Sequence, residues 1–307
     1  MPKIIFITGA TGFLGSHIAQ TLVKQGHQIV ALVRKSSDLW RCNPIKEKII
    51  LLYTDENDWQ QKLIDLSPTV FIHCAWIGVT ASERDDIQLQ NENLKLANTL
   101  LSLTKSLHLE KFICLGSQAE YGFINECVDE TFPAKPNTAY GMVKLKVQEL
   151  VQKHCEEQSI QWIWLRVFSI FGPLENENWL IPSLIKKMKT SNEMDMTEGN
   201  QVYAYLYVED FKFIVQKIVE KNIKVGIYNI SSLHTLSLRD LAERLKALIN
   251  PLFKINYGVL PYRAQQSMHI QGEISKLIGE IGEIPFTDIN FALLKTIDSY
   301  ISKTEKL

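Results

Sequence analysis

A serine, a tyrosine and a lysine in the middle of the chain have the types and the spacing that proton transfer to an oxygen atom requires. Tyr140 and Lys144 stand at i and i+4 where a helix is expected to begin, so both side chains lie on one helix face. A phenol can exchange a proton with an oxygen atom, and we expect the nearby ammonium to pull the phenol pKa toward neutrality. Ser117 follows a strand-like run and can hydrogen-bond the reacting oxygen. The pattern predicts general acid catalysis; the alternative is three unrelated surface residues.

The start of the chain predicts both a scaffold and a cofactor for this chemistry. Residues 4–7 are β-branched or aromatic, which is typical of a strand buried on both faces. Glycines follow, and a helical apolar pattern then begins. Free backbone N–H groups at such a helix start suit the pyrophosphate of a dinucleotide, and missing Cβ atoms allow its close approach. The predicted contacts are Gly9, Thr11, Gly12, Phe13, Leu14 and Gly15. The alternative is a tight strand-to-helix turn that binds no cofactor and needs its glycines only for the backbone geometry of the turn.

The end of the second predicted strand, residues 27–33, indicates which nicotinamide cofactor binds. In dinucleotide-binding units this point, about 20 residues past the glycines, meets the adenosine ribose. Arg34 and Lys35 stand here in place of the carboxylate that would bind the 2′-hydroxyl of NAD, and two cations suit the 2′-phosphate of NADP. Asp55, after the third strand, is the predicted partner of the adenine amino group. The sequence favours NADP(H), and NAD(H) is the alternative.

Further strand-like runs alternate with helical patterns along the chain. Strands are predicted at 48–53, 69–76, 112–115 and 162–168, and a long amphipathic helix at 86–107. Strands that alternate with helices indicate a parallel sheet covered on both faces. We therefore predict an α/β fold, with a Rossmann-type doubly wound parallel sheet and a smaller α/β lobe that binds substrate.

The composition argues against several other classes of protein. The 307 residues carry a net charge of −1 and are 46% apolar, so no global charge favours nucleic acid or a membrane as partner. The five cysteines form no C-x-x-C pair, which fits neither a disulfide framework nor a zinc site, and no metal is predicted. The first strand starts at once, without a signal-peptide pattern, and no apolar run approaches membrane length. We expect a cytoplasmic protein.

Taken in order, these motifs resemble the extended short-chain dehydrogenases that act on nucleotide sugars, the NAD-dependent epimerase/dehydratase family. The resemblance rests on the glycine spacing G-x-x-G-x-x-G, on Ser117, and on Tyr140 with Lys144. It also rests on residues 162–173, Trp-Ile-Trp-Leu-Arg-Val-Phe-Ser-Ile-Phe-Gly-Pro, which look like that family's sixth strand and the turn into its substrate lobe. The resemblance covers nearly the whole chain.

The resemblance implies further roles for individual residues. Ala75, in His73-Cys-Ala75, would lie under the cofactor pyrophosphate, and Lys144 would also hold the hydroxyls of the nicotinamide ribose. Ser169 stands where the family frequently has an asparagine. The residues expected to bind the nucleotide-diphosphate sugar are Gln118, Arg166, Ser169, Tyr203 and Arg263.

The chain departs from the family pattern at positions that concern substrate. Tyr203 replaces an arginine that usually binds the nucleotide diphosphate, which leaves Arg263 as the expected diphosphate arginine. The 4,6-dehydratases of the family carry an Asp-Glu pair where this chain has Gln118 and Ala119. Glu120, one place further on, is expected by alternation to face elsewhere. Dehydration through an acid pair is therefore not expected.

The family arrangement predicts two lobes that interleave in sequence. Residues 1–172 and 204–231 would form the NADP-binding Rossmann domain, and residues 173–203 and 232–307 the substrate-binding lobe. Helices in this family commonly pack against their copies, so the helix at 86–107 and the helix at Tyr140 predict a homodimer.

The function that these features imply is that of an NAD(P)-dependent short-chain oxidoreductase. We expect it to reduce the keto group of a nucleotide-linked deoxysugar, at C4, in the biosynthesis of surface-polysaccharide or glycan sugars. An epimerase with tightly held NAD shares every catalytic residue and is the alternative. A module that only senses NAD(P) is a second alternative, disfavoured because a sensor has no use for an activated phenol.

Overall fold

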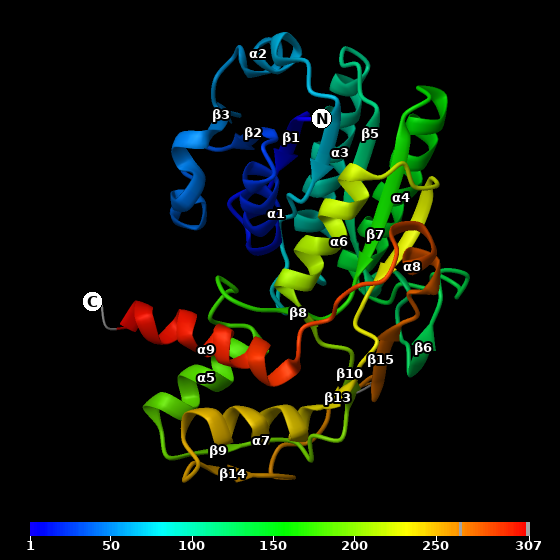
Figure 1. Ribbon diagram of the computed structural model, residues 1–307. Coiled ribbons are helices and arrows are strands. Elements are labelled where there is room, and N and C mark those ends of the chain that lie inside the picture. Colours follow the sequence, from blue (N-terminus) through cyan, green and yellow to red (C-terminus); the bar gives the residue numbers. More distant parts are fainter. Residues whose placement is uncertain (264–265, 305–307) are drawn as a thin grey trace.

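A seven-stranded parallel sheet forms the larger part of the molecule (Figure 1). The computed structural model describes residues 1–263 and 266–304, and the side chains of residues 1–263 and 266–300. The strand order is β12-β7-β5-β4-β1-β2-β3, and each neighbouring pair is parallel. The strands are β1 (Ile4–Thr8), β2 (Gln28–Val33), β3 (Ile49–Tyr53), β4 (Val70–His73), β5 (Lys111–Ser117), β7 (Gln161–Val167) and β12 (Gly226–Ile230). The predicted fold class is confirmed.

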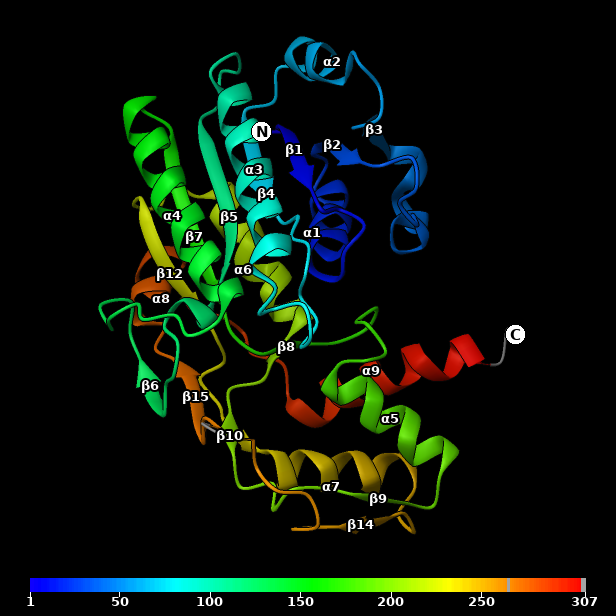
Figure 2. The ribbon, with the colours of Figure 1, turned by 180° about the vertical axis from the view of Figure 1, so that it is seen from behind.

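Both faces of the sheet are covered by helices, which explains the uninterrupted apolar strands. In β1, Ile5 and Ile7 join one hydrophobic core, while Phe6 between them joins the other. Helices α1 and α6 lie over the first face and α3 and α4 over the second, as the two opposite views show (Figures 1 and 2). The helices of this half are α1 (Phe13–Lys24), α2 (Trp59–Leu66), α3 (Ile87–Thr104), α4 (Ala139–Glu157) and α6 (Val208–Glu220), with the 3-10 helices η1 (Trp40–Lys48) and η2 (Gln118–Glu120).

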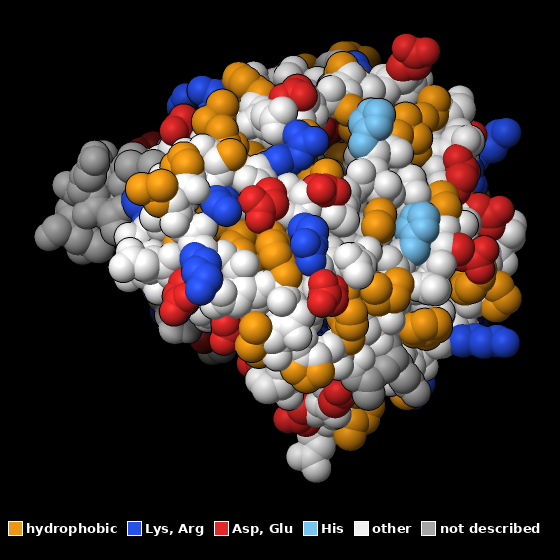
Figure 3. All heavy atoms as spheres, turned by 90° about the horizontal axis from the view of Figure 1, so that it is seen from below, with side chains coloured by type: hydrophobic (Ala, Val, Ile, Leu, Met, Phe, Trp, Pro, Cys, Tyr) orange, Lys and Arg blue, Asp and Glu red, His pale blue; other side chains and the backbone are white. Residues whose placement is uncertain are grey.

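A smaller lobe lies beyond the carboxyl ends of the strands. Helices α5, α7 and α9 pack together there, and short strands border them (Figure 1). The helices are α5 (Leu180–Thr190), α7 (Leu238–Ile249) and α9 (Ile289–Thr304). The short strands are β6 (Glu126–Val128), β8 (Ile170–Phe171), β9 (Glu193–Asp195), β10 (Val202–Tyr203), β11 (Leu206–Tyr207), β13 (Leu236–Ser237), β14 (Lys254–Asn256) and β15 (His269–Gly272). On the face seen from below, charged side chains of both signs are interspersed (Figure 3).

Two contacts join the lobes across the sequence. Helix α8 (Ser275–Ile281) packs on α6 and β12, although its sequence lies within the range expected for the substrate lobe. The carboxylate of Asp210, in α6, accepts hydrogen bonds from the backbone N–H and the hydroxyl of Thr287, just before α9. The division into two lobes at the expected boundaries stays a prediction.

The predicted strands and helices occur, with small shifts at their ends. The helix expected at 86–107 begins after its cap, Asp86, whose side chain accepts from Gln88 N–H and Leu89 N–H, and it ends at Thr104. The segment 69–76, expected as a strand that runs into a loop, forms a strand over Val70–His73. Within the described residues, no helix is both long enough and apolar enough to cross a membrane.

Candidate active site

The glycine turn between β1 and α1 is closed so tightly that side chains would not fit. A Cβ on Gly15 would lie 2.1 Å from the carbonyl oxygen of Gly9, and Gly9 itself has a φ of +72°. A Cβ on Gly9 would lie 2.6 Å from the backbone nitrogen of Ala75, so the turn packs directly on the predicted pyrophosphate segment. Gly12 caps α1 without any side-chain hydrogen bond, which leaves backbone N–H groups for an anion. This cradle fits a dinucleotide pyrophosphate.

The expected adenosine end of the site is open. Arg34 and Lys35 are exposed just after β2. The backbone N–H of Lys35 donates to the carboxylate of Asp55 at 2.7 Å, which brings the predicted adenine partner next to the two cations. The ammonium of Lys35 lies 3.8 Å from Glu56, whereas no ion pair involves Arg34 within the described residues. Arg34 is therefore the cation that remains available for a phosphate.

At the end of β4, buried polar groups hold the loop that faces the turn. The His73 ring nitrogen Nδ1 and the Thr8 hydroxyl are 2.7 Å apart, and burial lowers the pKa of His73 to about 3. This histidine is neutral and serves the structure. Asn93, buried in α3, exchanges two hydrogen bonds with the backbone of Ile77, which fixes the chain just beyond Ala75.

The first turn of α4 brings the tyrosine and the lysine to the carboxyl edge of the sheet. The side chain of Thr138 accepts from the N–H of Gly141 and caps the helix. Tyr140 and Lys144 are 7% and 4% exposed. The Lys144 ammonium donates to the carbonyl of Leu115 at 2.6 Å and lies 3.6 Å from the centroid of the Trp76 ring. Burial lowers the pKa of Lys144 to about 8.

Ser117 lies at the end of β5, beside this tyrosine. Its hydroxyl oxygen accepts from the N–H of Ala119 at 3.2 Å, which leaves its proton free to be donated. Burial raises the pKa of the Tyr140 phenol; the charge of Arg84 and hydrogen bonding from Ser117 oppose that rise. The structure therefore brings together Ser117, Tyr140 and Lys144, named below the catalytic cluster.

One expectation about this cluster is wrong. Lys144 was expected to pull the Tyr140 pKa toward neutrality, yet burial raises that pKa, and the main charge that opposes the rise is that of Arg84. The reason is geometric: the ammonium is 5.9 Å from the tyrosine ring centroid and is turned toward Trp76 and Leu115. Arg84 and Trp76, which contact the phenol ring, carried no motif that the sequence analysis could have used.

A buried ion pair supports Ser117 from behind. The Glu120 carboxylate lies 2.8 Å from the Arg166 Nε and accepts from Ser117 N–H at 2.7 Å and from the Trp164 indole N–H. Burial raises the pKa of Glu120, and the Arg166 charge with these N–H donors opposes the rise. Arg166 is 3% exposed and also stacks on Tyr121. In the structure the guanidinium is paired inside the protein, and its contact with substrate stays a prediction.

Of the other expected substrate residues, Tyr203 and Arg263 belong to the small lobe, and Gln118 and Ser169 follow strands β5 and β7 of the large sheet. The Tyr203 hydroxyl accepts from Gln266 and donates to the carbonyl of Ser267, so it holds the loop that follows Arg263. Arg263 is exposed, and its charge acts on Tyr203. Ser169 and Gln118 are half-buried, and the carbonyl of Ser169 accepts from Leu206 N–H.

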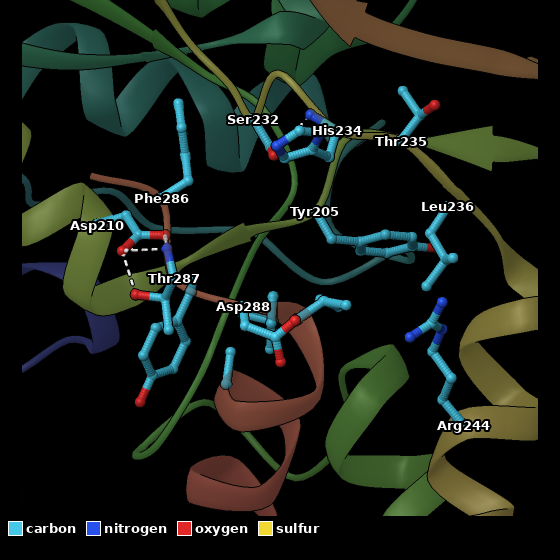
Figure 4. A pocket seen from close by; sticks show the side chains of 14 residues that line it. Tyr205, Asp210, Ser232, His234, Thr235, Leu236, Arg244, Phe286, Thr287 and Asp288 are labelled. Carbon is cyan, nitrogen blue, oxygen red and sulfur yellow. Dashed lines mark hydrogen bonds between the residues drawn. The ribbon is translucent and has the colours of Figure 1, made fainter. Parts of the chain in front are cut away.

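A cavity of about 330 Å³ opens elsewhere, between α6, α7 and α9 (Figure 4). Asp210 and Thr287, which are hydrogen-bonded to each other, line one side of this cavity. The side chain of Tyr205 points along the cavity toward Leu236 and Arg244. None of the residues expected to bind cofactor or substrate lines this cavity. The described residues contain no group of three or more His, Cys, Asp or Glu side chains that could hold a metal ion.

Comparisons with known proteins agree with this geometry. The model of the NAD dependent epimerase/dehydratase family matches residues 5–231. The chain is 26% identical to CDP-abequose synthase of Salmonella muenchen over 90% of each chain. It is also 26% identical to dTDP-6-deoxy-L-talose 4-dehydrogenase (NAD(+)) of Aggregatibacter actinomycetemcomitans, over 87% of this chain and 98% of the other. The solved UDP-N-acetylglucosamine 4-epimerase of Methanobrevibacter ruminantium has the same fold, with a TM-score of 0.88, 22% identity and coverage of 98% and 99%.

Proposed function

Because the chain belongs to the NAD dependent epimerase/dehydratase family, we propose that it reduces the keto group at C4 of a nucleotide-diphosphate deoxysugar. The observation that carries this proposal is the catalytic cluster without an acid pair. Tyr140 and Ser117 can supply a proton and a hydrogen bond to one oxygen. Gln118 and Ala119 cannot protonate one carbon and deprotonate its neighbour, which dehydration would require.

Two relatives act on nucleotide-linked sugars, and the name of one of them states chemistry at C4. One relative is a 4-dehydrogenase of a dTDP-linked 6-deoxysugar, and the other makes a CDP-linked sugar, abequose. Oxidation at C4 is the reverse of the proposed reduction, so it requires the same cluster of hydroxyl, phenol and ammonium. Both matches span about nine tenths of this chain.

Each residue of the cluster has a defined task in this proposal. The reduced nicotinamide, when bound, supplies the hydride to the carbonyl carbon. Tyr140 gives its proton to the carbonyl oxygen, and Ser117, whose hydroxyl already accepts from Ala119, donates a hydrogen bond to the same oxygen. Lys144, anchored on Leu115, holds the ribose hydroxyls of the cofactor. The glycine turn at the start of α1 would hold the dinucleotide pyrophosphate.

The family is described as NAD-dependent, and for this chain we propose a preference for NADP(H). Arg34 supports it, because its exposed guanidinium follows β2 where the adenosine ribose is expected. Dissociation constants for NADPH and NADH at fixed salt test the preference. Arg34→Asp should weaken NADPH by about 1.5–3 kcal/mol, the usual value of a charge-assisted hydrogen bond. Equal affinities, or tighter NADH, would reverse the assignment.

A 4-epimerase is the second candidate. It would use the same phenol to oxidise and then re-reduce the sugar, and one structure of the same fold is a 4-epimerase. Purified protein that already carries tightly held NAD(H) would favour the epimerase. Protein that binds NADPH reversibly and arrives without it would favour the reductase.

The test of the proposed function is a substrate panel. The full chain is incubated with NADPH or NADH and nucleotide-linked 4-keto-6-deoxyhexoses that differ in base and sugar. We expect loss of reduced-nicotinamide absorbance with one of them, and a product heavier by two hydrogens. A second arm uses nucleotide sugars that carry a hydroxyl at C4, with NAD+ added; a product of unchanged mass and inverted configuration at C4, without net use of cofactor, would establish the epimerase instead.

For assembly we propose a homodimer through α3 and α4. Met142 on α4 and Ile87 on α3 are exposed apolar residues, at 43% and 46%. A two-fold pairing of one such surface is the commonest oligomer geometry. Sedimentation at micromolar concentration should give a dimer, and Met142→Lys should shift it to the monomer. A monomeric wild-type protein would end this proposal.

A further inference from the structure

Arg84 lies in the loop between β4 and α3 and is fixed next to the phenol of the catalytic cluster. Its carbonyl accepts from the N–H of Tyr140 at 2.8 Å, which ties the loop to the start of α4. The amide of Gln90, buried in α3, donates to the carbonyls of Gly78 and Glu83 at 2.7 and 3.2 Å. The backbone of the loop that carries Arg84 is therefore held by residues of two helices, α3 and α4.

The guanidinium of Arg84 is the cation closest to the Tyr140 ring. Its carbon Cζ is 4.5 Å from the ring centroid, while the Lys144 nitrogen is 5.9 Å from it. The edge of the Trp76 ring meets the same phenol at a centroid distance of 5.9 Å. A planar guanidinium that stacks on an aromatic face restricts that ring and attracts its electrons. The tyrosine is thus held between an arginine and a tryptophan.

The charges around the phenol agree with this placement. Burial raises the pKa of Tyr140, Arg84 opposes the rise by charge and by hydrogen bonding, and Glu120 adds to it. Burial lowers the pKa of Lys144 itself to about 8, so its charge varies near neutral pH. An arginine stays charged at every pH at which proteins fold. A constant positive charge therefore faces the phenol from the loop side.

One atom of Arg84 lacks a partner. Its Nε is buried and has no hydrogen-bond partner in the part of the chain that the structure describes. Such a donor is unfavourable and calls for a functional reason. Stacking on Tyr140 offers one, because the guanidinium keeps this orientation at the expense of a hydrogen bond.

We propose that Arg84 is a positioning residue, which holds the Tyr140 ring by the face of its guanidinium and keeps a permanent positive charge beside the phenol while the proton is transferred. The inference rests on the proposed role of Tyr140 as the acid. When the O–H bond of Tyr140 breaks and the proton joins the substrate oxygen, the electron pair stays on the phenolate. The charge of Arg84 stabilises that phenolate.

The test follows the ionisation of Tyr140 directly, without cofactor or substrate. The full chain is labelled with 3-fluorotyrosine, which ionises at a lower pH than tyrosine, and the Tyr140 resonance is assigned by its loss in Tyr140→Phe. Arg84→Met should raise the pH at which this resonance titrates by about one to three units. Arg84→Lys should restore part of that shift, because it returns the charge without the planar face. Arg244→Met, in the other lobe, is the matched control and should change nothing.

The titration tests the role of Arg84 without requiring that the proposed reduction be correct. An unchanged Tyr140 titration in a folded Arg84→Met protein would overturn it. If Arg84→Met does not fold, Arg84→Lys provides the decision, since it should still raise the titration pH measurably above that of the wild type. A shifted titration in a protein that reduces no keto sugar would leave the positioning role intact and refute the function. With the reaction identified, kcat of Arg84→Met should fall more than KM rises.

Discussion

The catalytic cluster and the surroundings of Arg263 differ in how firmly the protein holds their side chains. Ser117, Tyr140 and Lys144 are almost fully buried and are anchored by the sheet, the start of α4 and a buried ion pair. Arg263 is exposed on a loop, and the hydroxyl of Tyr203 beside it bonds to the loop residues Gln266 and Ser267. The part that performs chemistry is preorganised, while the part expected to recognise the nucleotide rests on surface loops.

Because of this difference, we expect folding stability to depend on residues near the catalytic cluster and substrate affinity to depend on the loop at Arg263. Substitutions near the cluster remove buried partners and should alter both turnover and folding. Substitutions at the loop should alter affinity for substrate and leave folding nearly unchanged. Four predictions test this separation.

The largest effect is expected for the acid itself. Tyr140→Phe removes the phenol and leaves Lys144, Ser117 and the ring stacking in place, so cofactor should bind as before. Turnover should fall by roughly 10²–10⁴, the usual value of general acid catalysis. Steady-state rates and a cofactor titration on the same preparation measure both quantities. Turnover close to that of the wild type would remove Tyr140 from the mechanism.

The buried ion pair behind Ser117 should carry the largest effect on folding. Glu120→Gln keeps the shape but leaves Arg166 charged and unpaired in the interior, which should lower the free energy of unfolding by about 3–5 kcal/mol. The matched control is Glu92→Gln, which breaks an exposed pair with Lys95 and should cost about 1 kcal/mol or less. Urea denaturation compares the two. Equal losses would show that the cluster is no more firmly built than the surface.

Glu175, at the entrance to the small lobe, should make stability depend on pH. Burial raises the pKa of its carboxyl to about 8. The folded state then binds a proton that the unfolded state has lost, so stability should fall as pH rises from about 4.5 to about 8. Glu175→Gln should remove this loss and stabilise the protein by roughly 1–3 kcal/mol at pH 8.5, with little effect at pH 4. Thermal unfolding at both pH values measures it; an equal shift at both would contradict the burial of an ionisable carboxyl.

The smallest effect is expected at the exposed arginine. Arg263→Met should raise KM for the nucleotide sugar about tenfold through loss of a diphosphate contact, with kcat unchanged. Its free energy of unfolding should change by about 0.5 kcal/mol or less. Arg239→Met, in the same lobe and paired with Glu198, is the control that should leave KM unaffected. A fall in kcat instead of a rise in KM would place Arg263 near the reaction.

The sequence could predict what short local patterns encode. Glycine spacing, apolar strands and the i, i+4 pair of Tyr140 and Lys144 depend on neighbouring residues, and the fold follows from their order. The pairing of Glu120 with Arg166 joins residues 46 positions apart, so alternation along η2 could not reveal that this carboxylate turns inward. Arg84 reaches the phenol only because β4 and β5 are neighbours in the sheet. Contacts between distant segments therefore place Arg84 closer than Lys144 to the Tyr140 ring, and local sequence patterns could not predict this.

The most direct test of the proposed reduction follows the hydride itself. NADPH carrying deuterium at C4 of the nicotinamide, one diastereomer at a time, is incubated with the active 4-keto sugar of the panel. We predict that one diastereomer transfers its deuterium to C4 of the sugar, that the label stays there, and that one molecule of NADPH is consumed for each product. Unconsumed NADPH and no label in the sugar, together with inversion at C4 of a nucleotide sugar that carries a C4 hydroxyl, would indicate a 4-epimerase and contradict the proposed function.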